Sequence, residues 1–138
     1  MSGKTVVFLC VANSSRSQMA EGLARAKGPA GWRFFSAGSK PAGVHPLAVK
    51  AMSEIGIDIG AQRSKGLDQV PIREADVIVT LCAEEVCPVV PGPVSRVHWP
   101  IPDPAAVEGT EEARLAAFRA ARDEIARRLE TLWRGGAG

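Results

Sequence analysis

The 138-residue chain contains no tyrosine, few aromatic residues of any kind (5%) and only three cysteines. Its 17 basic and 15 acidic side chains leave a net charge of +2, and the basic residues are spread along the chain rather than gathered in one run. The sequence therefore lacks the basic patch expected of a protein that binds nucleic acid or a membrane surface. An odd number of cysteines also argues against a framework of structural disulfides.

Long apolar runs are missing as well. No segment approaches the ~20 apolar residues of a membrane span, and the apolar run after Thr5 is too short for a secretory signal. We therefore expect a cytoplasmic protein, in which cysteines stay reduced and are more often used chemically than paired. The length fits one domain, residues 1–138, which we expect to be a monomer.

Apolar segments alternate with amphipathic ones along the chain. Strands are predicted at residues 4–11, 32–36, 75–82 and 94–99, and helices at about 16–27, 46–55 and 110–133. Residues 58–72 are predicted to be loop, with one helical turn near Leu67. This alternation predicts an α/β fold: a three-layer, open, parallel four-stranded sheet with helices on both faces. Ligands of such sheets bind beyond the carboxyl ends of the strands, where Cys10 and Cys82 both fall.

A cysteine and an arginine stand at C-x5-R spacing where the first strand gives way to the first helix, in the run CVANSSRS. A short loop entering a helix turns backbone N–H groups toward an anion, and the same positive field stabilises a thiolate. The planar guanidinium of Arg16 can bind two oxygens of a tetrahedral oxyanion, and Ser17 can donate to Cys10. The predicted oxyanion-binding residues are Val11, Ala12, Asn13, Ser14, Ser15, Arg16 and Ser17, with Cys10 as the nucleophile. The alternative is a buried strand cysteine followed by a charged residue at a helix start.

These residues carry a resemblance to a known family. The run CVANSSRSQMAEG from Cys10 to Gly22 is similar to the signature of arsenate reductases on the low-molecular-weight tyrosine phosphatase fold. The likeness extends almost from end to end and includes Ser36-Ala37-Gly38, Thr80-Leu81-Cys82, His98-Trp99 and Asp103-Pro104. Two positions depart from the pattern, because the family often has glycine at Ala12 and cysteine at Ser15. Alanine is compatible with position 12 only if its backbone avoids the left-handed region.

The loop alone does not separate a phosphatase from a reductase, because phosphate and arsenate have nearly the same shape and charge. A reductase must supply two electrons, and Cys82 and Cys87 are thiols that can supply them. The resemblance implies that Cys10 attacks arsenic, that Cys82 then attacks Cys10 and releases arsenite, and that Cys87 takes over the disulfide. It also implies thioredoxin as the external reductant, no bound cofactor, and a role in arsenic detoxification.

The same residues are compatible with other functions. A low-molecular-weight tyrosine phosphatase would act through a Cys10 phospho-enzyme, with the extra cysteines protecting it from oxidation, and residual phosphatase activity is compatible with either enzyme. A non-catalytic oxyanion-binding module would need neither Cys82 nor an acid. Cys82, at the end of an apolar strand, is also consistent with a core residue. A zinc site of Cys82, Cys87 and His98 lacks the usual C-x2-C pair, so we predict no metal.

Asp103 lies in the stiff segment Trp99-Pro100-Ile101-Pro102-Asp103-Pro104, which can hold its carboxyl over the loop as a general acid. The alternative is an ordinary Asp-Pro turn. The next residue is Ala105, where phosphatases of this fold commonly have an aromatic residue that walls a pocket for a phenyl ring. A small inorganic oxyanion needs no such wall.

Asn13, Glu21 and Ser36 match positions that support the loop in some relatives, in part through a bound potassium ion. The fourth position, an acid in those relatives, is Lys65 here. We predict that the Lys65 ammonium group takes the place of the cation, pairs with Glu21 and makes the protein independent of potassium.

Overall fold

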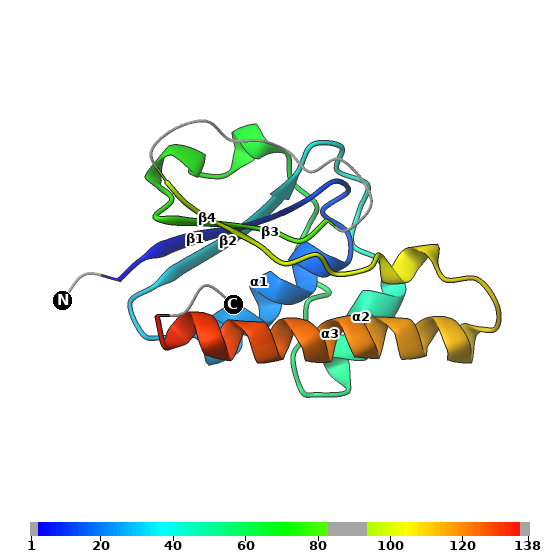
Figure 1. The fold of residues 1–138 in the computed structure, drawn as a ribbon. Helices are drawn as coiled ribbons and strands as arrows, with labels where there is room; N and C mark the ends of the chain where they lie inside the picture. The colour runs from blue at the N-terminus through cyan, green and yellow to red at the C-terminus, as the bar shows by residue number, and fades with distance from the viewer. Residues whose placement is uncertain (1–2, 83–93, 136–138) are drawn as a thin grey trace.

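The computed structural model describes residues 3–82 and 94–135, and Figure 1 shows a sheet with its helices gathered mainly on one side. The four strands are β1 (Thr5–Cys10), β2 (Arg33–Gly38), β3 (Val77–Thr80) and β4 (Ser95–His98). They form one sheet in the order β2-β1-β3-β4, and every pairing is parallel. The predicted open, parallel four-stranded sheet is therefore confirmed.

One face of the sheet carries all three α-helices of the described residues: α1 (Arg16–Lys27), α2 (Pro46–Ser53) and α3 (Glu111–Trp133). All six residues of β1 are buried, and alternation along this strand sends Val6 and Phe8 into the core beneath the helices. The residues from the helices and the β4 side that fill this core include Met19, Leu23, Met52, Trp99, Phe118 and Ile125. This core fixes the end of β1 against the start of α1, where the predicted loop lies.

The other face is covered by two short 3-10 helices, η1 (Leu67–Gln69) and η2 (Ile72–Glu74). The alternate residues of β1, Val7 and Leu9, lie in a smaller apolar cluster on this side. Helices on both faces are thus confirmed, with α-helices on one face and single helical turns on the other. None of the helices in the described part of the chain is both long enough and apolar enough to cross a membrane.

The ends of the elements follow local chemistry. The Thr110 hydroxyl accepts from the Ala113 N–H (3.1 Å) and starts α3, as the predicted helix start implies. Helix α2 ends at Ser53 rather than at residue 55, and Gly56 adopts a left-handed φ of 78° that reverses the chain. Strand β3 is shorter than predicted because only Val77–Thr80 have partners on both neighbouring strands.

An ion-pair cluster joins α2 to α3, and it predicts a pH dependence of stability. The Glu54 carboxylate accepts from Arg119 Nε (2.9 Å) and Nη2 (2.6 Å) and from Arg122 Nη1 (3.0 Å). Hydrogen bonding to Arg119, with a further contribution from Arg122, lowers the pKa of Glu54 from 4.5 to about 2. Between these values the native state binds fewer protons than the unfolded state, so the stabilisation is complete above about pH 4.5 and is lost as the pH falls toward 2.

We therefore expect Glu54→Gln to lower the free energy of unfolding at pH 7, and we expect the gap between wild type and variant to close between pH 4.5 and 2. Urea titrations at several pH values would measure this, with Glu130→Gln, on the exposed side of α3, as the matched control. A gap at pH 2.5 as large as that at pH 7 would contradict the prediction.

Candidate active site

The loop between β1 and α1 turns its carbonyl groups outward. Each carbonyl oxygen of residues 11–14 accepts a hydrogen bond from outside the loop. The donors are the backbone N–H groups of Lys40 (2.9 Å, to Val11), Ala42 (3.0 Å, to Ala12) and His45 (2.9 Å, to Ser14), and the hydroxyl of Ser64 (2.5 Å, to Asn13). The described chain contains no cis peptide bond, so the N–H groups of residues 12–15 point the opposite way, into the loop. Together with the positive end of α1, they form a setting for an anion.

Cys10 lies at the mouth of this loop as a buried free thiol. Its Sγ is 2.8 Å from the hydroxyl of Ser17, in the first turn of α1, so the contact expected from the sequence is present. Ser15 is 3% exposed, and within the described residues its hydroxyl has no hydrogen-bond partner. A buried hydroxyl in that state retains a donor for a bound oxyanion.

Arg16 ties the loop to two other segments at the carboxyl ends of the strands. Its Nη1 donates to the carbonyl of Leu81 (3.2 Å), just after β3, and to that of Ile101 (2.9 Å), which follows β4. Its Nη2 lies 3.9 Å from a carboxylate oxygen of Asp103. The guanidinium is almost fully buried, so these contacts fix its plane beside the loop.

Asp103 forms the Asp-Pro turn considered from the sequence, and its carboxyl group lies beside Arg16. Its Oδ1 accepts from the Ala105 N–H (3.0 Å) and caps the short 3-10 helix η3 (Pro104–Ala106), while its Oδ2 faces Arg16. The Asp103 side chain is 38% exposed, so its carboxyl group is accessible to solvent. The capped Asp-Pro turn therefore holds the Asp103 carboxyl group near the loop.

Two backbone features allow the loop to close tightly. Asn13 is the only non-glycine residue with positive φ (47°) in the described chain. The backbone of Ala12 therefore avoids the left-handed region, as alanine requires at this position. Gly38, at the end of β2, passes so close that a Cβ there would lie 2.4 Å from the Val11 carbonyl oxygen and 2.9 Å from the Asn13 nitrogen. Only glycine fits against the loop at this point.

Glu21 is the centre of the supporting cluster. One of its oxygens accepts from Ser36 Oγ (2.5 Å) and lies 3.4 Å from Lys65 Nζ, and the other lies 2.9 Å from Arg25 Nε. Lys65 also donates its backbone N–H to Asn13 Oδ1 (2.8 Å). The four predicted supporting residues are thus brought together, and two cations already neutralise the buried carboxylate.

Cys82 lies at the same edge of the sheet as Cys10. Strands β1 and β3 pair Leu9 with Thr80, and the Leu81 N–H donates to the Leu9 carbonyl (2.9 Å), so the chain at Cys82 runs beside the start of the loop. Cys82 is buried and disulfide-bonded. Cys87 lies outside the described residues. In the two described ranges, no group of three His, Cys, Asp or Glu side chains is placed to hold a metal ion.

A family model described as low molecular weight phosphotyrosine protein phosphatase matches residues 5–135. The chain belongs to that phosphatase family. It is 50% identical over 133 residues to an arsenate reductase of Halalkalibacterium halodurans, a match that covers 95% of this chain and 96% of the relative.

Two solved structures are also similar to this chain in fold and sequence. An arsenate reductase in the phosphate binding state has a TM-score of 0.79 and 33% identity, covering 96% of this chain and 98% of the other. A thioredoxin-dependent arsenate reductase of Corynebacterium glutamicum has a TM-score of 0.74 and 30% identity, covering 97% of this chain and 62% of the other. The chain therefore shares both its family and its fold with these proteins.

Sequence reasoning missed three polar side chains behind the family's loop: Gln18, Gln62 and Ser64. Gln18 is wholly buried and donates to both oxygens of Asn13 (3.1 and 2.9 Å). Gln62 and Ser64 fall in the segment predicted only as loop, and the Ser64 hydroxyl binds the Asn13 carbonyl. The sole sequence signal was the position of Gln18 inside the motif itself.

His45 connects the loop to the helices. Its backbone N–H holds the Ser14 carbonyl, its Nδ1 accepts from the Leu47 N–H (3.1 Å) to cap α2, and its ring lies 4.7 Å from that of Phe118. Burial first, and then the charge of Arg114, lower the pKa of His45, against the raising effect of Asp103. A neutral imidazole suits the capping role, because Nδ1 must stay unprotonated to accept.

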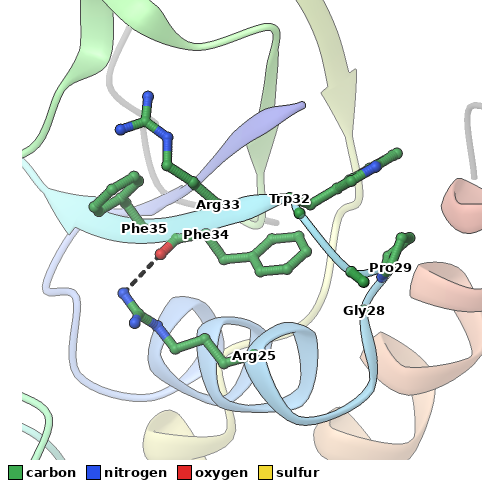
Figure 2. Close-up of a pocket in the computed structure, with 9 residues that line it drawn as sticks. Arg25, Gly28, Pro29, Trp32, Arg33, Phe34 and Phe35 are labelled. Carbon is green, nitrogen blue, oxygen red and sulfur yellow. Dashed lines mark hydrogen bonds between the residues drawn. The ribbon is translucent and has the colours of Figure 1, made fainter. Parts of the chain in front are cut away.

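A separate hollow of about 570 Å³ lies between the end of α1 and the start of β2 (Figure 2). In this view Arg25 reaches from α1 to the Phe34 carbonyl (2.7 Å), and the same guanidinium also holds Glu21. Cys10 pairs with Gly38, the last residue of β2, whereas the hollow is at its first residues. The hollow is therefore at the far end of the sheet from the anion loop, and Arg25 acts as a structural cation there.

Proposed function

We propose that this chain reduces arsenate to arsenite through a relay of three thiols, Cys10, Cys82 and Cys87, and that thioredoxin recycles it. One observation carries the proposal: a free thiol in an anion loop lies at the same sheet edge as a second cysteine that is disulfide-bonded. A phosphatase needs only the first thiol, because water completes its reaction. The relatives that are named arsenate reductases support the same choice.

The first step uses the loop. Arsenate binds to the N–H groups of residues 12–15, to the Ser15 hydroxyl and to Arg16, which together match its three unreacting oxygens. The Cys10 thiolate attacks arsenic and forms a sulfur–arsenic bond. The arsenic–oxygen bond to one arsenate hydroxyl breaks, and that hydroxyl leaves as water after taking a proton from Asp103, which lies at the Arg16 side of the loop.

The second step moves the electrons. The Cys82 thiolate attacks Cys10 Sγ, so that a sulfur–sulfur bond forms and the sulfur–arsenic bond breaks with its electron pair on arsenic. Arsenic is thereby reduced from the +5 to the +3 state and leaves as arsenite, while two thiols are oxidised to one disulfide. Cys87 then attacks Cys82, which frees Cys10 for another cycle. A dithiol reductant, thioredoxin, reduces the remaining disulfide.

The test is a comparison of two substrates with one preparation. We expect arsenite to form from arsenate when thioredoxin, its reductase and NADPH are present, and to stop when thioredoxin is omitted. p-Nitrophenyl phosphate should be cleaved more slowly, if at all, because Ala105 offers no aromatic wall. Cleavage of the phosphate ester with no arsenite release would instead make the chain a phosphatase.

We also propose that the loop needs no potassium. Lys65 and Arg25 already place two positive charges on the buried Glu21 carboxylate, and Lys65 sits on the oxygen shared with Ser36. The expected result is equal activity and equal melting temperature in potassium and sodium salts. A clear advantage of potassium for the wild-type protein would contradict this.

Lys65→Asp is expected to create a cation dependence that the wild type lacks. The change removes the ammonium group and adds a second carboxylate beside Glu21, so a bound monovalent cation should stabilise the variant by mass action. We expect its melting temperature to be about 2–5 °C higher in potassium chloride than in sodium chloride. Lys40→Asp, the same charge change on an exposed lysine, is the control and should not discriminate between the two salts.

A further inference from the structure

Five side chains form a continuous hydrogen-bonded chain that ends on the Cys10 sulfur. Its links are Gln62 Nε2 to Gln18 Oε1 (2.7 Å), Gln18 Nε2 to Asn13 Oδ1 (2.9 Å), Asn13 Nδ2 to Ser17 Oγ (2.8 Å) and Ser17 Oγ to Cys10 Sγ (2.8 Å). The first residue comes from the segment before η1, and the others come from the end of β1, the loop and the start of α1. This series of hydrogen bonds therefore connects the Cys10 sulfur to a part of the molecule outside the anion loop.

Backbone groups fix the orientation of each amide in this chain. The Lys65 N–H donates to Asn13 Oδ1 (2.8 Å), so the other end of that amide, facing Ser17, is its nitrogen. Gln18 Nε2 faces the carbonyls of Asn13 (3.1 Å) and Arg63 (3.0 Å), which accept only from a nitrogen. Gln62 Nε2 likewise faces the Gln18 carbonyl (3.2 Å). All three amides thus donate in one direction, toward Cys10.

The direction of these hydrogen bonds determines whether the Ser17 hydroxyl donates to the Cys10 sulfur or accepts from it. Its hydroxyl oxygen accepts from Asn13, and it has a single hydrogen to donate. Ser17 is 0% exposed, and in the described part of the chain its only other partner is Cys10. The hydroxyl hydrogen is therefore on the sulfur, which acts as an acceptor, and an acceptor sulfur is favoured as thiolate over thiol. Each donor also polarises the next, so the outer links strengthen the inner one.

We propose that Gln18 and Gln62 are positioning residues for the nucleophile: they are the outer links of a one-directional hydrogen-bond chain that holds Asn13 and Ser17 so that Cys10 is kept as a thiolate. Gln18 has no alternative partner in solvent, because it is wholly buried between the loop and residues 62–63. Gln62 is half-buried, and its amide supplies the first donor. The inference rests on Cys10 being the nucleophile of the proposed reductase, but its test requires no arsenate.

The test measures how fast iodoacetamide alkylates Cys10 from pH 5 to 9 in the full chain, with the Cys10 peptide quantified by mass spectrometry. Gln62→Met keeps the length of the side chain and removes its donor without adding charge. We expect the midpoint of the pH profile to rise by roughly 0.5 unit, with alkylation about threefold slower below the midpoint. Gln18→Met should raise the midpoint further. Gln69→Met is the matched control, because Gln69 accepts from the Gly66 N–H in the same segment and should leave the midpoint unchanged.

The pH profile separates positioning from simple loosening of the structure. Loosening alone would change the rate on the alkaline plateau or the melting temperature and would leave the midpoint in place. If Gln62→Met and a folded Gln18→Met both kept the wild-type midpoint, the proposal would be overturned. Because Gln62 is only half-buried, its variant remains informative even if Gln18→Met fails to fold. If the variants showed the expected midpoint shifts but the wild-type protein produced no arsenite, the reductase function would be refuted and this inference would stand.

Discussion

The Cys82→Ser protein is expected to stop releasing arsenite while its anion loop stays functional. Serine cannot accept the disulfide bond, so the Cys10–arsenic adduct has no internal electron donor and turnover should fall by on the order of 10³-fold or more. Cys82 follows β3 and lies beside the loop, but no hydrogen bond of the loop carbonyls depends on it. Binding of phosphate, measured by calorimetry, should therefore remain close to that of the wild type.

The matched variant is Cys10→Ser, which removes the nucleophile itself. It should abolish both arsenite release and any cleavage of p-nitrophenyl phosphate, whereas Cys82→Ser should abolish only the former. Thioredoxin must be the sole reductant in these assays, because a small thiol could attack the adduct in place of Cys82. Undiminished arsenite release by Cys82→Ser under that condition would eliminate the relay.

The Arg16→Lys protein is expected to lose much of its activity although the charge is conserved. Lysine provides a point charge, whereas Arg16 has a rigid planar guanidinium that donates to the carbonyls of Leu81 and Ile101. We expect kcat/KM for arsenate to fall on the order of 10²-fold or more, the scale on which a single oxyanion donor acts. The melting temperature should fall too, because the buried guanidinium connects three segments.

Steady-state kinetics on arsenate, with phosphate as a competitive inhibitor, would measure this effect. Arg127→Lys is the comparison, since Arg127 is largely exposed on α3, where it pairs with Glu124. A kcat/KM for Arg16→Lys within threefold of the wild type would mean that the guanidinium geometry does not matter for oxyanion binding.

The fold was largely predictable because its elements have strong local signals. Helix α1 was predicted at its observed bounds, since the apolar spacing and Gly28 mark both the face and the end. Strand ends were less certain: β3 is limited by its pairing partners, which no local pattern reveals. The second face was also harder to predict, because η1 and η2 are single turns whose apolar residues show no helical period.

The candidate site likewise contains residues that could be predicted from the sequence and residues that could not. The placement of Cys10, Arg16 and Ser17 around one loop could be predicted from spacing, because the C-x5-R run joins the end of a strand to the start of a helix. The roles of Gln18 and Gln62 could not, since an amide becomes informative only when its partners from distant segments are known. The double use of Asp103 as cap and ion-pair partner likewise needed the position of Arg16.

Asn13 has a further consequence for how this protein can evolve. Its backbone is left-handed, its carbonyl accepts from Ser64, its Oδ1 accepts from Gln18 and Lys65, and its Nδ2 donates to Ser17. Aspartate would lack the donor and glycine would lack every side-chain bond, so each single exchange forfeits at least one of these groups. A saturation library at this codon should return asparagine almost alone, and drift in neighbouring codons should be confined to changes that leave its surroundings intact.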